Sequence, residues 1–170
     1  MRKIYYFLLG HGIKTKDLFY AQYDKNGLFQ AYDTCVRYAF AREFLTNGGK
    51  HGFWYKLYTK MQNKRGTQER NNTQRFIDLI NSYVKNGYNG LKIVLFKHGK
   101  VLSNGSHRLA LNLLFNYKYI YFKRNDTDKD TRNYGINWFK NNGFSKKEIS
   151  EICKIKNEIF QKYHLENKMD

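Results

Sequence analysis

The segment VLSNGSHRLALNLLF, residues 101–115, constrains the fold more than any other part of the sequence. It begins as a short β-type run, is interrupted by an Asn-Gly pair, and continues with apolar residues at helical spacing. A strand that passes directly into a helix is typical of α/β architectures. The sequence therefore predicts a sharp turn at Gly105 and a helix whose first residues are Ser106, His107 and Arg108.

The neighbouring segments predict a small mixed sheet packed against helices. Upstream, an apolar stripe at helical spacing begins near Thr73, a candidate N-cap, and ends at Gly87, where a left-handed stop is expected. A strand at residues 91–96, a tight turn at 97–100, the run at 101–102 and a further strand at 117–123 complete this part of the chain.

The flanking regions are predicted to be mostly helical. At the N-terminal side, residues 2–9 read as a strand or an extended arm, and residues 27–45 and 53–65 read as helices. At the C-terminal side, Ser145 and Glu148 have the spacing of a capping box at the start of an apolar-faced helix.

These elements and the length of 170 residues predict one domain of the α/β (α+β) class, spanning residues 1–170. Its core is expected at residues 73–123. Residues 1–72 form a helical N-terminal extension and residues 132–165 a C-terminal helical arm.

Charge is the strongest compositional signal, because the formal net charge is +17. Such a charge points to phosphates of nucleotides, nucleic acid or an anionic membrane surface. A chain rich in Lys, Asn, Ile, Tyr and Phe and without Pro is also what an AT-rich genome produces, and both explanations stay open. The sequence has no run long enough to span a membrane and no signal peptide, so we expect a cytoplasmic protein. Cys35 and Cys153 match no metal or redox spacing.

The predicted strand-to-helix turn forms a candidate anion site. The first N–H groups of a helix lack intrahelical partners and lie at the positive end of its dipole. Gly105 lets a phosphate approach the backbone, while Ser106, His107 and Arg108 can add a hydroxyl, a ring N–H and a bidentate guanidinium. The alternative is that Ser106 caps the helix, His107 packs in the core and Arg108 pairs with a surface carboxylate.

Residues 73–122 resemble the ParB/sulfiredoxin-like superfamily, which includes partition proteins, sulfiredoxins and free serine kinases. The resemblance rests on the order and spacing of a helix ending in Gly, a strand, and a Gly-x-His-Arg turn followed by Ala. The matching positions are Ser82, Gly87, Gly105, His107, Arg108 and Ala110. The resemblance implies a nucleoside triphosphate, with ATP as the expected nucleotide, whose phosphates lie against the turn formed by residues 105–108. It also implies Mg²⁺ as a cofactor.

The chain departs from that pattern at two positions and in one region. Sulfiredoxin chemistry needs a cysteine where this chain has Ser106, which excludes that activity. Kinase-like relatives carry Asp where this chain has Asn104, and an amide cannot serve as a general base. Partition proteins continue into a helix-turn-helix domain, for which the C-terminal sequence shows no second recognition helix.

A catalytic base is therefore expected elsewhere, and Glu69 is the first choice because Arg65, Arg70 and Arg75 surround it. Those arginines also fit ordinary solvated charges. The other acidic candidates are Asp33, Glu43, Asp78 and a trio at residues 126, 128 and 130, which lacks the Gly and Glu of a calcium loop.

Taken together, the sequence predicts a nucleotide-dependent phosphotransferase that acts on a small hydroxylated or sugar metabolite, in surface-polysaccharide biosynthesis if the resemblance extends to function. The alternative is a ParB-like nucleic-acid-binding module or nuclease. Catalysis is assigned to Asn104, His107 and Glu69, and phosphate binding to Gly105, Ser106, His107, Arg108 and Arg75.

Overall fold

The computed structural model describes residues 12–49, 51–66 and 72–167. Within them a mixed sheet has the strand order β1-β4-β2-β3. β1 pairs antiparallel with β4, β4 runs parallel to β2, and β2 pairs antiparallel with β3. The predicted α+β class with a small mixed sheet is confirmed. The strands are β1 (Gly12–Lys14), β2 (Ile93–Leu95), β3 (Leu102–Asn104) and β4 (Tyr119–Arg124).

The hairpin predicted around residues 97–100 is present. β2 and β3 are joined there, and the backbone N–H of Phe96 donates to the carbonyl of Val101 at 3.0 Å. β2 is shorter than the predicted strand at 91–96, and β3 extends to Asn104, so the turn into the next helix consists of Gly105 alone.

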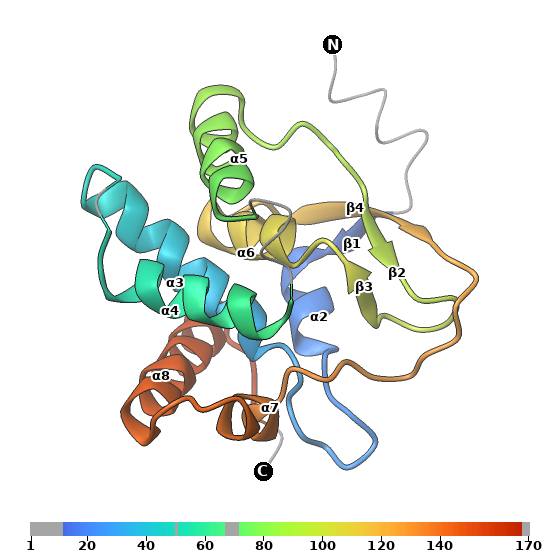
Figure 1. Ribbon diagram of the computed structural model, residues 1–170. Coiled ribbons are helices and arrows are strands. Elements are labelled where there is room, and N and C mark those ends of the chain that lie inside the picture. Colours follow the sequence, from blue (N-terminus) through green and yellow to red (C-terminus); the bar gives the residue numbers. More distant parts are fainter. Residues whose placement is uncertain (1–11, 50, 67–71, 168–170) are drawn as a thin grey trace.

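α3 (Tyr32–Thr46) is the central helix, and the side chains of residues 32–41 are all buried. It packs against α4 (Phe53–Lys64), α6 (Ser106–Leu114) and α8 (Lys146–Lys162) (Figure 1). The prediction that this helix begins at Gly27 was wrong. Residues 27–31 are held instead by isolated bridges, which pair Tyr23 with Phe29 and Ala31 with Tyr134.

α5 (Asn72–Asn86) ends as the sequence predicts. Gly87 has a φ of +69°, and its N–H donates to the carbonyl of Tyr83 at 3.0 Å. Thr73, however, lies inside the helix and is not its N-cap.

The N-terminal region contributes to the sheet as well as to the helical layer. β1 and the short helix α2 (Thr15–Tyr20) follow one another, and β1 forms the edge of the sheet beside β4. Neither element is predicted from the sequence. The strand or arm predicted at residues 2–9 lies outside the described residues.

The C-terminal region contains α7 (Ile136–Asn141) and α8. The predicted capping box of α8 is confirmed, because the Ser145 hydroxyl accepts from the Glu148 N–H while the Glu148 carboxylate accepts from the Ser145 N–H. A long connection leads from β4 past β3 to α7 (Figure 1). Among the described helices, none is long and apolar enough to cross a membrane.

Candidate functional site

A cavity of about 800 Å³ lies where α3, the end of α4, the start of α5, the β3–α6 turn and the β4–α7 connection meet. Its volume is in the range of small-molecule sites. The described lining residues include no Asp or Glu, so the charged lining is entirely cationic. The cationic lining residues are Arg37, Arg65, Arg75, Arg108, Lys129 and Arg132.

The β3–α6 turn forms one wall. Gly105 has a φ of +113°, and a Cβ placed on it would lie 2.5 Å from Cγ2 of Ile93, so only glycine fits. The turn therefore brings the N-terminal end of α6 to the cavity, which Gly105, Ser106, His107 and Arg108 all line. No side chain caps this helix, and its first N–H groups have no intrahelical partners.

Three arginines surround the buried carboxylate of Asp33 at the back of the cavity. Oδ2 of Asp33 lies 2.9 Å from Arg37 Nη1, 2.7 Å from Arg132 Nη2 and 3.9 Å from Arg65 Nη1. The carboxylate is fully buried, and the side chains of Arg37 and Arg132 are 2% and 5% exposed. Three positive charges therefore share one buried negative charge.

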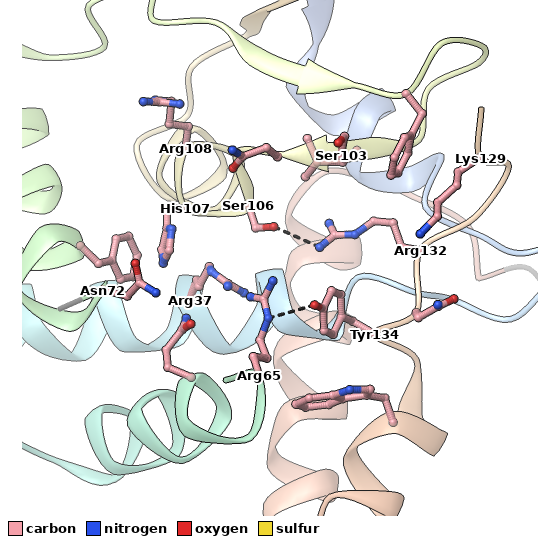
Figure 2. Close-up of a pocket in the computed structure, with 18 of the residues that line it drawn as sticks. Arg37, Arg65, Asn72, Ser103, Ser106, His107, Arg108, Lys129, Arg132 and Tyr134 are labelled. Carbon is pink, nitrogen blue, oxygen red and sulfur yellow. Dashed lines mark hydrogen bonds between the residues drawn. The ribbon is translucent and has the colours of Figure 1, made fainter. Parts of the chain in front are cut away.

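Ser106 and Tyr134 tie this arginine cluster to the cavity wall. Arg132 Nη2 donates to the Ser106 hydroxyl at 3.0 Å, and Arg65 Nε donates to the Tyr134 hydroxyl at 3.0 Å (Figure 2). Ser106 thus interacts with an arginine from the β4–α7 connection and does not cap α6.

Several polar atoms of the arginine cluster have no hydrogen-bond partner within the described part of the chain. Among the described residues, Nε of Arg37 and Nη1 of Arg132 are buried and have no hydrogen-bond partner. Oδ1 of Asp33 is also without a partner. A buried donor that is left unsatisfied is costly, and more so when it carries charge. The cluster is therefore incomplete in both charge and hydrogen bonding.

Asp33 and Arg37 both stay charged at neutral pH. Burial raises the pKa of Asp33, but Arg132, Arg37 and Arg65 together outweigh burial and hold this pKa below its ordinary value. Burial lowers the pKa of Arg37 to about 10, against the opposing effect of Asp33. A group with this pKa is protonated at neutral pH, so Arg37 gives the cavity a fixed positive charge.

His107 is directed to the same side of α6 as the cluster but stays neutral. Burial, followed by the charges of the nearby arginines, lowers the pKa of His107 well below its ordinary value. Its Nε2 lies 2.8 Å from the Tyr58 hydroxyl, and its ring centroid is 4.3 Å from that of Phe76. His107 therefore both lines the cavity and packs against aromatic rings.

The other predicted phosphate ligands lie farther from the cluster. Arg108 lines the cavity, but its guanidinium points away from Arg37 and Arg132 (Figure 2). Its Nη1 lies 3.5 Å from the carbonyl of Lys92, and its buried Nε has no partner among the described residues. Arg75 and Asn104 are exposed residues of the lining.

The acidic candidates separate into different roles. Asp33 belongs to the arginine cluster, whereas the carboxylate of Glu43 accepts from the N–H groups of Trp54 and Tyr55 at the start of α4. Asp78 is exposed and bonded to a neighbouring side chain of its own helix, and residues 126, 128 and 130 lie exposed in the β4–α7 connection. Glu69 lies outside the described residues.

Sequence reasoning missed Arg37, Arg132 and Tyr134, and it named Asp33 only as one of several acidic candidates for the base. A signal existed for one pair only, because Asp33 and Arg37 have the i, i+4 spacing of a helical ion pair. Arg132 is 99 residues from Asp33 in sequence, and no local pattern marks it.

The described residues contain no preformed cluster of metal ligands. They contain no group of three or more His, Cys, Asp or Glu side chains placed to hold a metal ion. Since Mg²⁺ sites use carboxylate oxygens, this part of the cavity supplies none of the expected ligands.

Comparison with known proteins adds no assignment: no family model, curated protein or solved structure matches the chain.

Proposed function

We propose that the chain is a nucleotide-dependent phosphotransferase whose nucleotide phosphates bind in the cavity at the N-terminal end of α6. The observation that supports this proposal is the buried excess of positive charge. Arg37, Arg65 and Arg132 surround the single carboxylate of Asp33. An uncompensated buried charge is strongly unfavourable, and a phosphate group would neutralise it. The unpartnered donors of Arg37 and Arg132 are buried, and small side-chain shifts would turn them toward the same group.

The cluster suits transfer as well as binding. In phosphoryl transfer, positioning and stabilisation of the charge on the phosphoryl oxygens account for most of the catalysis. Arginines fixed by Asp33, Ser106 and Tyr134 are preorganised for that purpose and need little rearrangement when the ligand binds.

The transfer step requires an acceptor and a base. The acceptor hydroxyl attacks the terminal phosphorus, the bond from that phosphorus to the bridging oxygen breaks, and the hydroxyl proton passes to a base. Asn104, which is exposed on the cavity wall, can hold the acceptor hydroxyl. Glu69 remains the proposed base. His107 is a weak base because its pKa is low, so its part is to shape the wall next to the phosphates.

The acceptor remains a small hydroxylated or sugar metabolite, as the superfamily resemblance implies. Mg²⁺ remains a proposed cofactor, although the described lining residues offer it no carboxylate. A nucleic-acid backbone could use the same cations and is the second candidate. The depth of the arginine cluster favours a small ligand, because the two closest arginines are almost fully buried.

A thermal-shift screen with ATP, CTP, GTP and ADP, each with and without Mg²⁺, tests phosphate binding. A nucleotide at about 100 times its Kd should raise Tm by roughly 5–10 °C, because it binds only the folded chain. Inorganic tripolyphosphate should also raise Tm. If none of these ligands changes Tm, the proposed function is wrong.

Two variants test where the nucleotide binds. Arg108→Ala should weaken nucleotide binding by about 2–5 kcal/mol if its guanidinium contacts phosphate, while the fold survives. Arg42→Ala is the matched control, since Arg42 forms an exposed ion pair with Glu158 away from the cavity. Unchanged affinity in Arg108→Ala would remove Arg108 from the phosphate site and leave the arginines around Asp33 as its cations.

Transfer needs its own assay. The protein is incubated with nucleotide labelled on the γ-phosphate and a panel of sugars and polyols, and labelled acceptor is sought. Label that reaches an acceptor supports a phosphotransferase, whereas tight nucleotide binding without any transfer across the panel indicates a binding protein.

A further inference from the structure

A second cavity of about 610 Å³ adjoins the first. One wall comes from residues 28–30 and from Tyr32 at the start of α3, and the other from Asn133, Gly135 and residues of α7. Asn133 and Trp138 line both cavities, so the two lie next to each other.

The two cavities differ in chemistry. The first is lined by cations, whereas the second is lined mainly by apolar and amide side chains, with Lys140 as the charged group among its described lining residues. Its apolar walls include Leu28, Tyr32 and Trp138, and its amides come from Gln30, Asn133 and Asn137. Leu28 is 42% exposed, so part of its apolar surface is accessible.

The wall around Leu28 is preformed. The Asp24 carboxylate accepts from the N–H groups of Asn26 and Leu28 and from the Gln30 side-chain amide, each at 2.9 Å. The bridge between Ala31 and Tyr134 then fixes this loop against the opposite wall. The cavity therefore does not depend on a ligand for its shape.

We propose that the second cavity binds the base of the nucleotide whose phosphates occupy the first, an inference that rests on the proposed function. A ligand that spans both spaces must have an anionic end and an apolar end with polar edges. A nucleobase has apolar faces that pack on Leu28, Tyr32 and Trp138, and donor and acceptor edges that amides such as Asn137 can read. Asn133, at the junction, is then placed to contact the ribose.

The apolar part of the first cavity is a poorer site for the base. It includes Phe76 and Leu79, but the ring of Phe76 is already packed against His107 and Tyr58. That part of the lining also holds Arg75, whose charge favours the phosphates.

The test compares ATP with tripolyphosphate, which has the phosphates but no base, by calorimetric titration of the intact chain. Wild type should bind ATP at least about tenfold more tightly, because stacking and hydrogen bonding of a base commonly contribute that much. Asn137→Trp, which fills the second cavity from the exposed face of α7, should weaken ATP binding by about tenfold and leave tripolyphosphate within about twofold.

Controls separate this inference from its alternatives. Asn141→Trp places the same side chain on the same helix away from the cavity and should change neither affinity. Leu79→Ala should also leave the preference for ATP intact. Equal wild-type affinity for the two ligands, no effect of Asn137→Trp, or a selective loss of ATP binding in Leu79→Ala would each overturn the proposed base site while the phosphate site stands. If wild type binds neither ligand, the proposed function fails and this inference fails with it.

Discussion

At the scale of single residues, Asp33 decides how the site is organised. Its buried carboxylate holds Arg37 and Arg132 at hydrogen-bonding distance and Arg65 at 3.9 Å. Without it, three cations would face one another in a space of low dielectric constant. With it, the cluster keeps an excess of two positive charges, which is opposite in sign and similar in magnitude to the charge of a phosphate group.

Asp33→Asn should destabilise the fold, because it leaves the buried arginines without their counter-charge. Removing one partner of a buried ion pair commonly costs about 3–5 kcal/mol, or roughly 10 °C in Tm for a chain of this length. Tripolyphosphate should raise the Tm of this variant by more than it raises the Tm of wild type, since it replaces the missing negative charge. An equal shift in both proteins would indicate that the anion binds away from Asp33.

The same residue predicts a pH dependence. The pKa of Asp33 is lower in the folded chain than its unfolded value of about 4, so the carboxylate stabilises the fold above that pH. This stabilisation is lost as pH falls through the folded pKa. The Tm difference between wild type and Asp33→Asn should therefore be constant from about pH 8 to pH 5 and shrink only below about pH 4. A difference that disappears near neutral pH would contradict the assignment.

At the scale of elements, the β3–α6 turn aims the positive end of a helix at the cavity. The chain passes from Asn104, the last residue of β3, to Ser106, the first of α6, through Gly105 alone. Such a short turn requires a backbone conformation that side chains other than glycine rarely adopt, and Ile93 of the neighbouring strand occupies the space of a Cβ. The same close packing of strand and helix fixes Ser106 next to Arg132.

Gly105→Ala should lower the free energy of unfolding by roughly 2–5 kcal/mol, because backbone strain and a clash with Ile93 add together. Gly99→Ala is the matched control. Gly99 also has a positive φ, of +67°, but no described atom lies within 4 Å of its added Cβ, so the cost should be about 1–2 kcal/mol. Urea denaturation of both variants measures the two values, and equal losses would show that the contact with Ile93 is unimportant.

At the scale of the whole molecule, the net charge of +17 and the positive charge of the cavity come mostly from different side chains. Most of the charge lies on exposed side chains spread along the chain, where salt screens it. The arginine cluster is buried, and screening by salt is weaker there. Surface charge attracts any polyanion, whereas under the proposed function the cluster binds only a group small enough to enter.

Salt dependence therefore distinguishes the nucleotide from nucleic acid. Binding of a single-stranded oligonucleotide should fall steeply with salt and be lost by about 0.15 M, while ATP binding persists at that ionic strength. Both are measured by fluorescence anisotropy across a salt series. Oligonucleotide affinity that survives at about 0.15 M salt with a steep log-log slope would favour the nucleic-acid alternative.

The sequence by itself determined the local structure around the site. The strand, the glycine turn and the helix at residues 101–115, the stop at Gly87 and the capping box of α8 depend on contacts between residues a few positions apart. The predicted start of α3 was wrong because Phe29 pairs with Tyr23 and Ala31 pairs with the distant Tyr134, and the helical spacing of apolar residues reveals neither bridge.

Only the tertiary structure brought together Asp33 from α3, Arg65 from the end of α4, Arg132 from the β4–α7 connection and Ser106 from α6. The sequence singled out Ser106 as a phosphate ligand and Asp33 as an acidic candidate, but no local pattern linked either of them to Arg132. Packing of α3 against α4 and α6 brings these residues together in one place, where water screens their charges less than it would at the surface.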